Sequence, residues 1–183
     1  MKEKQKKRIL DISMSLDGYL ATKEDDISWL SIVNKEGEDY GYEKFIAGID
    51  TYIVGKTTYD VVVKLCDGKF PQGAMFDSYV ITRQTLPSEN GVTFYNGDLE
   101  ELINKLKQGK GKNIYCDGGA QIVKMLMSKE LIDEYIISIM PIILGDGKRL
   151  FIGEIPGKAL ELLSCKNYES GLIQVHYSKK RKA

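Results

Sequence analysis

The sequence predicts an α/β protein with a mostly parallel central sheet. Short apolar runs alternate along the chain with stretches of helical periodicity, which is typical of strands joined by crossover helices. Several of these runs end in glycine or small polar residues just before a helical pattern begins. The last two alternating segments are separated only by Glu169, Ser170 and Gly171, which indicates a terminal antiparallel hairpin. At 183 residues, we expect one domain spanning residues 1–183.

The expected strands follow from alternation and from apolar, β-branched runs. In chain order they cover residues 8–15, 51–55, 78–83, 92–95, 113–116 and 133–144, then the hairpin segments 159–170 and 172–180. Pro141 lies inside the long isoleucine-rich segment, which suggests an edge position or a bulge because proline cannot donate to a sheet.

Four helices are expected between these strands. They cover about residues 38–49, a stretch after Lys56, residues 98–109 with a stop at Gly109, and residues 120–131. Leu99, Leu102, Ile103 and Leu106 form one apolar stripe of the third helix. The fourth helix follows two glycines directly, which places Gly118 and Gly119 where free backbone N–H groups favour an anion.

Composition and charge exclude several classes of function. Lys plus Arg and Asp plus Glu both number 26, so there is no general basic field for nucleic acid. The basic start, residues 1–8, and the closing Ser-Lys-Lys-Arg-Lys-Ala are expected to be solvated tails, and no apolar run suggests a signal peptide or a membrane span. Three dispersed cysteines and one histidine argue against a disulfide framework and a zinc site. A cytoplasmic, metal-free protein is expected.

The segment Val54–Asp60, Val-Gly-Lys-Thr-Thr-Tyr-Asp, contains the Gly-Lys-Thr of a phosphate-binding P-loop. A P-loop needs a further glycine five residues earlier, where this chain has Asp50, so a nucleotide-triphosphatase reading fails. The segment still predicts a strand that ends at Gly55 and a helix opened by Lys56, Thr57 and Thr58. Those groups could hold a phosphate, although a plain capped turn is the simpler reading.

Two further strand-to-helix junctions carry similar groups. Thr82 and Arg83 follow a buried strand, and a hydroxyl beside a guanidinium suits a phosphate monoester. Asp117, Gly118, Gly119, Ala120 and Gln121 form another junction, without the full Gly-x-Gly-x-x-Gly fingerprint of a standard dinucleotide fold. If the strands are parallel, all three junctions share one edge of the sheet. One extended ligand with several phosphates would explain them together.

Some acids and the single tryptophan have two readings each. Asp17 precedes Gly18 after the first strand, where a turn role is the simpler one. Asp39 lies at the start of the first expected helix, where acids also interact favourably with the helix dipole. Trp29 is either a plug on the core or one wall of a ligand pocket.

Together the motifs resemble the dihydrofolate-reductase-like superfamily, and within it the family of the C-terminal reductase domain of the riboflavin-pathway deaminase–reductase. The motifs on which this resemblance rests are Ser-Leu-Asp-Gly-Tyr-Leu-Ala at residues 15–21, Val-Gly-Lys-Thr-Thr-Tyr-Asp, Val-Ile-Thr-Arg, and the long block that runs from Asp117 to Phe151. The resemblance implies a three-layer α/β/α fold with a mostly parallel mixed sheet and a C-terminal antiparallel hairpin. It also suggests a homodimer.

The resemblance further implies NADPH as cofactor. Lys56, Thr57, Thr58, Thr82 and Arg83 would flank its adenosine phosphates. Gly118, Gly119, Ala120 and Gln121 would approach the pyrophosphate beside Gly55, and Asp117 would lie at the cofactor and the substrate. Leu144, Gly145 and Asp17 would border the nicotinamide and substrate, with Trp29 as a candidate substrate contact.

Dihydrofolate reductases use one buried carboxylate on the first helix to assist protonation of the substrate. Asp39 lies sixteen residues before Gly55, which matches that spacing, so it is the expected proton donor, with a raised pKa in an apolar cleft. Glu38 is the adjacent alternative, and Asp17 is the other candidate catalytic acid.

The predicted function is an NADPH-dependent reductase acting on a C=N or C=O bond of a small heterocyclic or ribosylated substrate. The most specific candidate is the ribosylaminopyrimidine of riboflavin synthesis, followed by a pteridine or folate-like ring. Riboflavin-pathway reductases usually carry Glu-Gly-Gly where this chain has Asp117-Gly118-Gly119, and the chain has no deaminase domain. A binding module that keeps the cofactor cleft without catalysis is the alternative, and a dimeric scaffold without a ligand is a third reading.

Overall fold

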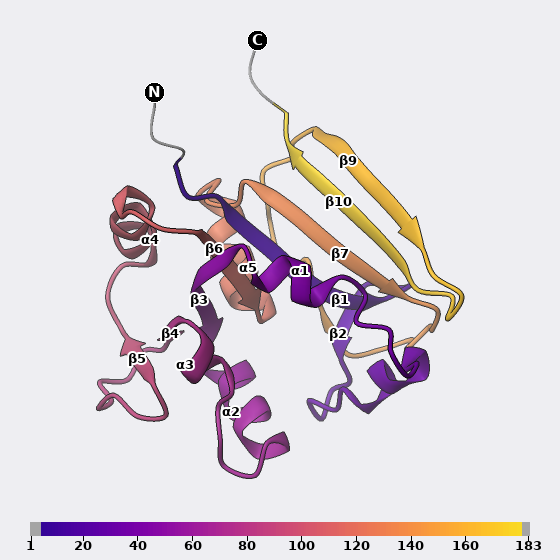
Figure 1. Ribbon diagram of the computed structural model, residues 1–183, viewed down its shortest axis with the longest axis horizontal. Helices are drawn as coiled ribbons and strands as arrows, with labels where there is room; N and C mark the ends of the chain where they lie inside the picture. The colour runs from indigo at the N-terminus through magenta and orange to yellow at the C-terminus, as the bar shows by residue number, and fades with distance from the viewer. Residues whose placement is uncertain (1–4, 181–183) are drawn as a thin grey trace.

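Eight strands form the central sheet of the protein, and a computed structural model describes residues 5–180 of it. The strand order is β5-β4-β3-β6-β1-β7-β10-β9. Pairings from β5 to β7 are parallel, whereas β10 pairs antiparallel with both β7 and β9. Figure 1 shows the β9–β10 hairpin beside β7 at one side of the molecule and β5 with α4 at the other. The predicted mostly parallel sheet with a terminal antiparallel hairpin is confirmed.

The strands and helices have the following bounds. The strands are β1 (Arg8–Ser15), β2 (Tyr19–Ala21), β3 (Ile49–Gly55), β4 (Asp77–Ile81), β5 (Val92–Tyr95), β6 (Asn113–Gly118), β7 (Glu134–Met140), β8 (Lys148–Arg149), β9 (Leu160–Asn167) and β10 (Ile173–Lys179). The helices are the 3-10 helix η1 (Ser28–Val33), α1 (Tyr42–Ile46), α2 (Lys56–Leu65), α3 (Gln72–Met75), α4 (Leu99–Gln108) and α5 (Ala120–Ser128). A second, two-stranded sheet pairs β2 with β8.

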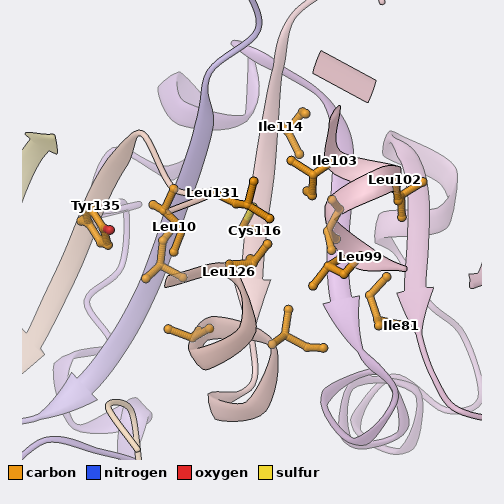
Figure 2. Close-up of a cluster of buried hydrophobic side chains, with 14 of the residues drawn as sticks. Leu10, Ile81, Leu99, Leu102, Ile103, Ile114, Cys116, Leu126, Leu131 and Tyr135 are labelled. Carbon is orange, nitrogen blue, oxygen red and sulfur yellow. The ribbon is translucent and has the colours of Figure 1, made fainter. Parts of the chain in front are cut away.

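Two apolar layers hold the helices against opposite faces of the sheet. Side chains of α4 and α5, among them Leu102, Ile103 and Leu126, pack on Leu10 and Ile114 of the sheet. Figure 2 shows this cluster between the strands and the helices. On the other face, a second cluster joins α1, α2 and the two phenylalanines that flank α3, Phe70 and Phe76, to strands β3, β4 and β6. Each layer buries apolar area that is exposed in the unfolded chain, which is the main term stabilising the fold. The expected three-layer α/β/α arrangement is therefore present.

The first helix is shorter than expected. The pattern predicted a helix over about residues 38–49, and the structure has only α1, Tyr42–Ile46. Gly41 precedes it at φ +83°, a left-handed conformation that interrupts a helix started further upstream. Pro141 was also misread. It follows the end of β7, which is paired on both sides by β1 and β10, so β7 is neither an edge strand nor bulged there.

The start of the chain is not the solvated tail that its charge suggested. Lys6 and Arg8 are both buried, and β1 begins at Arg8. Lys6 Nζ lies 2.9 Å from Asp50 Oδ1, and the Arg8 guanidinium donates two bonds of 2.7 Å to the Asp133 carboxylate. These ion pairs satisfy charges that burial would otherwise leave uncompensated. Residues 1–4 lie outside the described residues.

The end of the chain differs from its expectation in the same way. Ser178 and Lys179 belong to β10, and the Lys179 ammonium donates to the Glu130 carbonyl. Residues 181–183 lie outside the described part. Every residue of β9, the edge strand beside β10, is exposed. The homodimer that the resemblance suggested stays a prediction.

Candidate active site

One large cavity, of about 1750 Å³, opens at the carboxyl edge of the parallel strands. Gly55 at the end of β3 pairs in register with Ile81 of β4, and Val54 pairs with Gly118 of β6. Because the three strands run in the same direction, their junctions to the following segments meet at one edge. Residues of all three junctions line the cavity: Gly55, Lys56, Thr57, Thr58, Thr82, Arg83, Asp117, Gly119, Ala120 and Gln121. Gly118 is not on the lining, although it is buried behind it.

Two helices begin at this cavity without a side-chain cap. The N-cap residues are Gly55 for α2 and Gly119 for α5, and neither helix has an acidic residue in its first turn. By contrast, α4 is capped by Asp98, whose side chain accepts from the Glu101 N–H at 2.9 Å. The first N–H groups of a helix have no partner within the helix, and the helix dipole favours negative charge there. Two uncapped helix starts on one cavity suit a ligand with two anionic groups.

The glycines at this edge allow a close approach of backbone segments. A Cβ atom on Gly119 would lie 3.1 Å from Thr58 Oγ1, and one on Gly55 would lie 2.9 Å from Ile122 Cγ1. Gly118 has φ +117° and joins Gly119 through a cis peptide bond. Any side chain here would narrow the cavity or displace its wall, so these positions fit a group that needs backbone contact, such as a pyrophosphate.

The cations of this edge are placed differently from one another. The Lys56 ammonium pairs with Asp60 at 2.5 Å and lies 5.5 Å from the centroid of the Tyr59 ring. Arg83 is exposed just past β4. The Thr82 hydroxyl accepts a bond of 3.1 Å from the Gln84 N–H, which orders the turn in which Arg83 lies. Lys56 and Arg83 thus place two cationic groups at the same edge as the two helix starts, and Asp60 offsets the charge of Lys56.

Acidic and polar side chains of the sheet line a second part of the cavity. Asp11 and Ser13 come from β1, Asp117 from β6, Ser138 from β7 and Gln174 from β10. The hydroxyls of Tyr52 and Tyr115 both donate to the Asp117 carboxylate, the second at 3.1 Å. Polar groups in this part of the cavity are available to recognise a heterocycle by hydrogen bonds.

Both carboxyl groups of this region have raised pKa values. Burial raises the pKa of Asp11 to about 7, and the neighbouring Asp117 carboxylate acts in the same direction. Burial also raises the pKa of Asp117, although hydrogen bonds from Tyr52 and Tyr115 oppose the rise. A carboxyl group with a pKa near 7 can hold a proton at neutral pH and release it.

Asp11 was missed by the sequence reasoning. It occupies a polar position of the alternating run Arg8–Ser15, and such positions normally face solvent. The available signal was the type of residue: an acid in the middle of a first strand that becomes central in a parallel sheet, where both faces are covered.

Asp39 does not have the environment expected of it. The expectation was a buried carboxylate with a raised pKa, and this is wrong. Asp39 is exposed at the cavity rim, where it accepts bonds from the N–H groups of Gly41 (2.8 Å) and Glu43 (2.9 Å). These backbone bonds lower its pKa. Asp39 orders the start of α1, and Glu38 is exposed as well.

Asp17, Leu144 and Gly145 are brought together, but they are not on the cavity lining. The Asp17 carboxylate accepts from the Ser15 hydroxyl at 2.7 Å and from the N–H groups of Leu144 (3.1 Å) and Gly145 (2.7 Å). These bonds lower the pKa of Asp17 to about 2. A carboxylate held by three donors is a poor proton donor, so the structure gives Asp17 a role in fixing the loop.

Trp29 is a plug on the core. It is buried in a cluster with Val33, Met140 and Leu172, whereas the neighbouring Leu30 and Val33 line the cavity. Of the two readings left open by the sequence, the packing role is the one observed. Within residues 5–180, no group of three or more His, Cys, Asp or Glu side chains could hold a metal ion. None of the described helices is long and apolar enough to cross a membrane.

The fold and this cavity define a dihydrofolate-reductase-like α/β/α protein. Within that class, the chain belongs to the family of the RibD C-terminal domain, whose model matches residues 6–174. It is 36% identical to the uncharacterized protein YwjB of Bacillus subtilis (strain 168), over 94% of this chain and 98% of that protein. It is 30% identical to the uncharacterized protein YyaP of the same organism, over 95% of each chain.

Solved structures resemble the chain over nearly its whole length. A protein of Shewanella sp. PV-4, provisionally assigned to riboflavin biosynthesis, superposes with a TM-score of 0.84 at 29% identity, over 96% of this chain and 99% of that one. The Thermotoga maritima diaminohydroxyphosphoribosylaminopyrimidine deaminase/5-amino-6-(5-phosphoribosylamino)uracil reductase gives a TM-score of 0.70 at 15% identity. That match covers 96% of this chain and 57% of the Thermotoga chain, and it shows the shared fold.

Proposed function

We propose that the protein is an NADPH-dependent reductase that transfers hydride to a C=N or C=O bond of a small heterocyclic or ribosylated substrate. The observation that carries this proposal is the division of one cavity into two parts. One part has two uncapped helix starts, a glycine-lined wall and two cations, and the other has the paired carboxyls of the sheet. A dinucleotide phosphate and a polar ring are the ligands that these two parts fit.

The residues present fit NADPH. The N–H groups at the starts of α2 and α5 would hold its pyrophosphate, next to the wall formed by Gly55 and Gly119. Lys56, Thr82 and Arg83 would contact the phosphates of its adenosine half. The negatively charged 2′-phosphate there would form an ion pair with the Arg83 guanidinium. When bound, the cofactor supplies a hydride, while the protein supplies position and electrostatics.

The most specific substrate we propose is 5-amino-6-(5-phosphoribosylamino)uracil. Support comes from membership of the RibD C-terminal domain family and from the fold shared with the Thermotoga reductase of that compound. A pteridine or dihydrofolate-like ring is the second candidate, because its amino and oxo groups would also find hydrogen-bond partners on Asp11, Asp117 and Gln174.

Two measurements test this function. NADPH should raise the melting temperature of the protein, because a ligand that binds only the folded state stabilises it. NADPH oxidation is then followed by absorbance with the phosphoribosylaminouracil, dihydrofolate, a dihydropterin and simple carbonyl compounds. Turnover of any of these supports the reductase. A thermal shift without turnover on the whole panel would indicate a cofactor-binding module, and the absence of a shift would contradict both.

A further inference from the structure

Asp11 and Asp117 come from adjacent strands and face the same part of the cavity. In the parallel pairing of β1 with β6, Leu10 lies opposite Cys116, and Asp11 and Asp117 are the residues that directly follow this last paired position. Both residues line the cavity. The two carboxyl groups are near enough for the charge of Asp117 to raise the pKa of Asp11. Two carboxylates held this close repel each other, and the repulsion is relieved when they share one proton.

The two acids differ in their partners. Asp117 accepts hydrogen bonds from Tyr52 and Tyr115, and these bonds stabilise its ionised form. Among residues 5–180, no hydrogen bond or ion pair joins Asp11 to a side chain, and no cation contributes to its pKa. The shared proton therefore belongs on Asp11, where it donates a hydrogen bond, while Asp117 remains an acceptor.

The other charged and titratable groups near the two acids do not change which of them holds the proton. Glu134 of β7 is occupied by Lys7 at 2.5 Å and by His176 of β10 at 3.0 Å. Lys44 and Lys166 line the cavity, but neither affects the pKa of either acid. The groups that face the pair are Tyr42 from α1, Tyr52 from β3, Tyr115 from β6, Ile136 and Ser138 from β7, and Gln174 from β10.

We propose that Asp11 is the proton donor of the reaction, and that Asp11 and Asp117 together select a substrate that presents an acceptor atom beside an N–H group. This inference rests on the proposed reductase function and names the substrate class of that site. The acceptor atom, an imine nitrogen or a carbonyl oxygen, receives the bond from the Asp11 carboxyl. The adjacent N–H donates to the Asp117 carboxylate. An amino-substituted pyrimidine or pteridine offers this pair of atoms, whereas a simple ketone offers only the acceptor.

Reduction of a C=N bond adds one hydride to carbon and one proton to nitrogen, and the π bond is replaced by a C–H and an N–H bond. The hydride carries both electrons and comes from the reduced cofactor, which is oxidised. The proton comes from the Asp11 carboxyl, which is left as a carboxylate. Water in the open cavity then returns a proton to Asp11 before the next cycle.

The first test reads the proton directly and needs no substrate. Aspartate carboxyl groups are labelled with carbon-13 in the full chain, and their chemical shifts are followed against pH. The Asp11 signal, assigned as the one missing in Asp11→Asn, should titrate near pH 7. In Asp117→Asn its midpoint should fall by about one unit or more, because the neighbouring charge is gone. A midpoint of Asp11 near the value of a free aspartate, or one unaffected by Asp117→Asn, would overturn the proposal.

The second test uses turnover of the phosphoribosylaminouracil with NADPH. The Asp11→Asn variant should lower kcat by about 100-fold or more, which is the usual contribution of general acid catalysis. Its KM for NADPH and its NADPH-induced thermal shift should stay as in the wild type. The fall of kcat above about pH 7 should disappear with the carboxyl group. The matched control is Asp77→Asn, an exposed strand aspartate outside the cavity, which should leave kcat unchanged.

The outcomes separate this inference from the proposed function. Wild-type turnover that survives in Asp11→Asn, with the same pH profile, overturns the role of Asp11 and leaves the reductase standing. No wild-type turnover with any compound of the panel contradicts the reductase, and the catalytic role of Asp11 is rejected with it. The carbon-13 titration then still decides whether the two acids share a proton.

Discussion

The Asp17 carboxylate accepts a hydrogen bond of 2.7 Å from the backbone N–H of Gly145, 128 positions further along the chain. With the bond from Leu144, it ties the turn after β1 to the loop after β7. That loop continues into Asp146, Gly147, Lys148 and Arg149, all of which line the cavity. Asp17 therefore positions one wall of the cavity from outside it.

Replacing Asp17 with alanine should lower stability, because it releases the loop that the Asp17 carboxylate holds. The folded state lowers the pKa of Asp17 to about 2, below the usual 3.8. The contribution of Asp17 to the stability of the folded protein is therefore complete above about pH 4, and it is lost as the pH falls toward 2. Melting temperatures of wild type and Asp17→Ala should therefore differ at pH 7 and converge at acid pH. Equal melting temperatures of the two proteins at pH 7 would show that these three hydrogen bonds do not stabilise the fold.

Replacing Asp11 with asparagine should raise the stability of the protein at alkaline pH. The folded state raises the pKa of Asp11 from 3.8 to about 7, so the native protein favours the protonated form. The contribution of Asp11 to the stability of the folded protein is full below about pH 4 and is lost as the pH rises through 7. Each unit of pKa difference corresponds to about 1.4 kcal/mol before screening. Asp11→Asn should thus be more stable than wild type at pH 8, as measured by urea denaturation. Equal stability at pH 8 would mean that Asp11 is ionised in the folded protein without a cost.

Adding one methyl group at Gly119 should weaken NADPH binding. The new Cβ would lie 3.1 Å from Thr58 Oγ1, so either the hydroxyl or the wall has to shift at the start of α5. We expect about tenfold weaker binding by Gly119→Ala, which corresponds to about 1.4 kcal/mol. Gly157→Ala is the matched control, since a Cβ there meets nothing within 4 Å. If both variants bind NADPH equally, the phosphates lie elsewhere.

Removing the guanidinium of Arg83 should affect NADPH more than NADH. Arg83 is exposed just past β4, and in the proposed binding mode its guanidinium would pair with the 2′-phosphate that only NADPH carries. Arg83→Ala should lower NADPH affinity severalfold at low salt and leave NADH affinity unchanged, and the difference should shrink as salt screens the pair. Fluorescence titration with both cofactors measures this. An equal loss of affinity for NADPH and NADH would indicate that Arg83 contacts a group that both cofactors carry.

The strands and the meeting of the three junctions were predictable because both depend on local pattern. Apolar alternation defined β1 at its observed bounds, and parallel pairing brings the ends of β3, β4 and β6 to one edge. The role of Asp39 was not predictable in this way. A matching spacing to Gly55 counts residues, but it does not show that Gly41 turns the chain and exposes the carboxylate.

Long-range pairing explains most of the other differences. The charges of Lys6 and Arg8 predicted a solvated tail, because their partners Asp50 and Asp133 lie far away in the sequence. Asp11 was missed for the same reason. Its unusual proton affinity arises from burial and from Asp117, which is a neighbour only after β1 and β6 have paired.

The pairing of β1 with β6 also determines how rigid the acidic pair is. Carboxyl groups on mobile loops can relax their repulsion by moving apart. Asp11 and Asp117 are on adjacent hydrogen-bonded strands in the middle of an eight-stranded sheet, and the Arg8–Asp133 ion pair secures the start of β1. Leu10 and Cys116, which directly precede them, are paired in the ladder and hold the two strands together beside the acids. The geometry of the pair is therefore set before any ligand arrives, and a compound that enters has to match it.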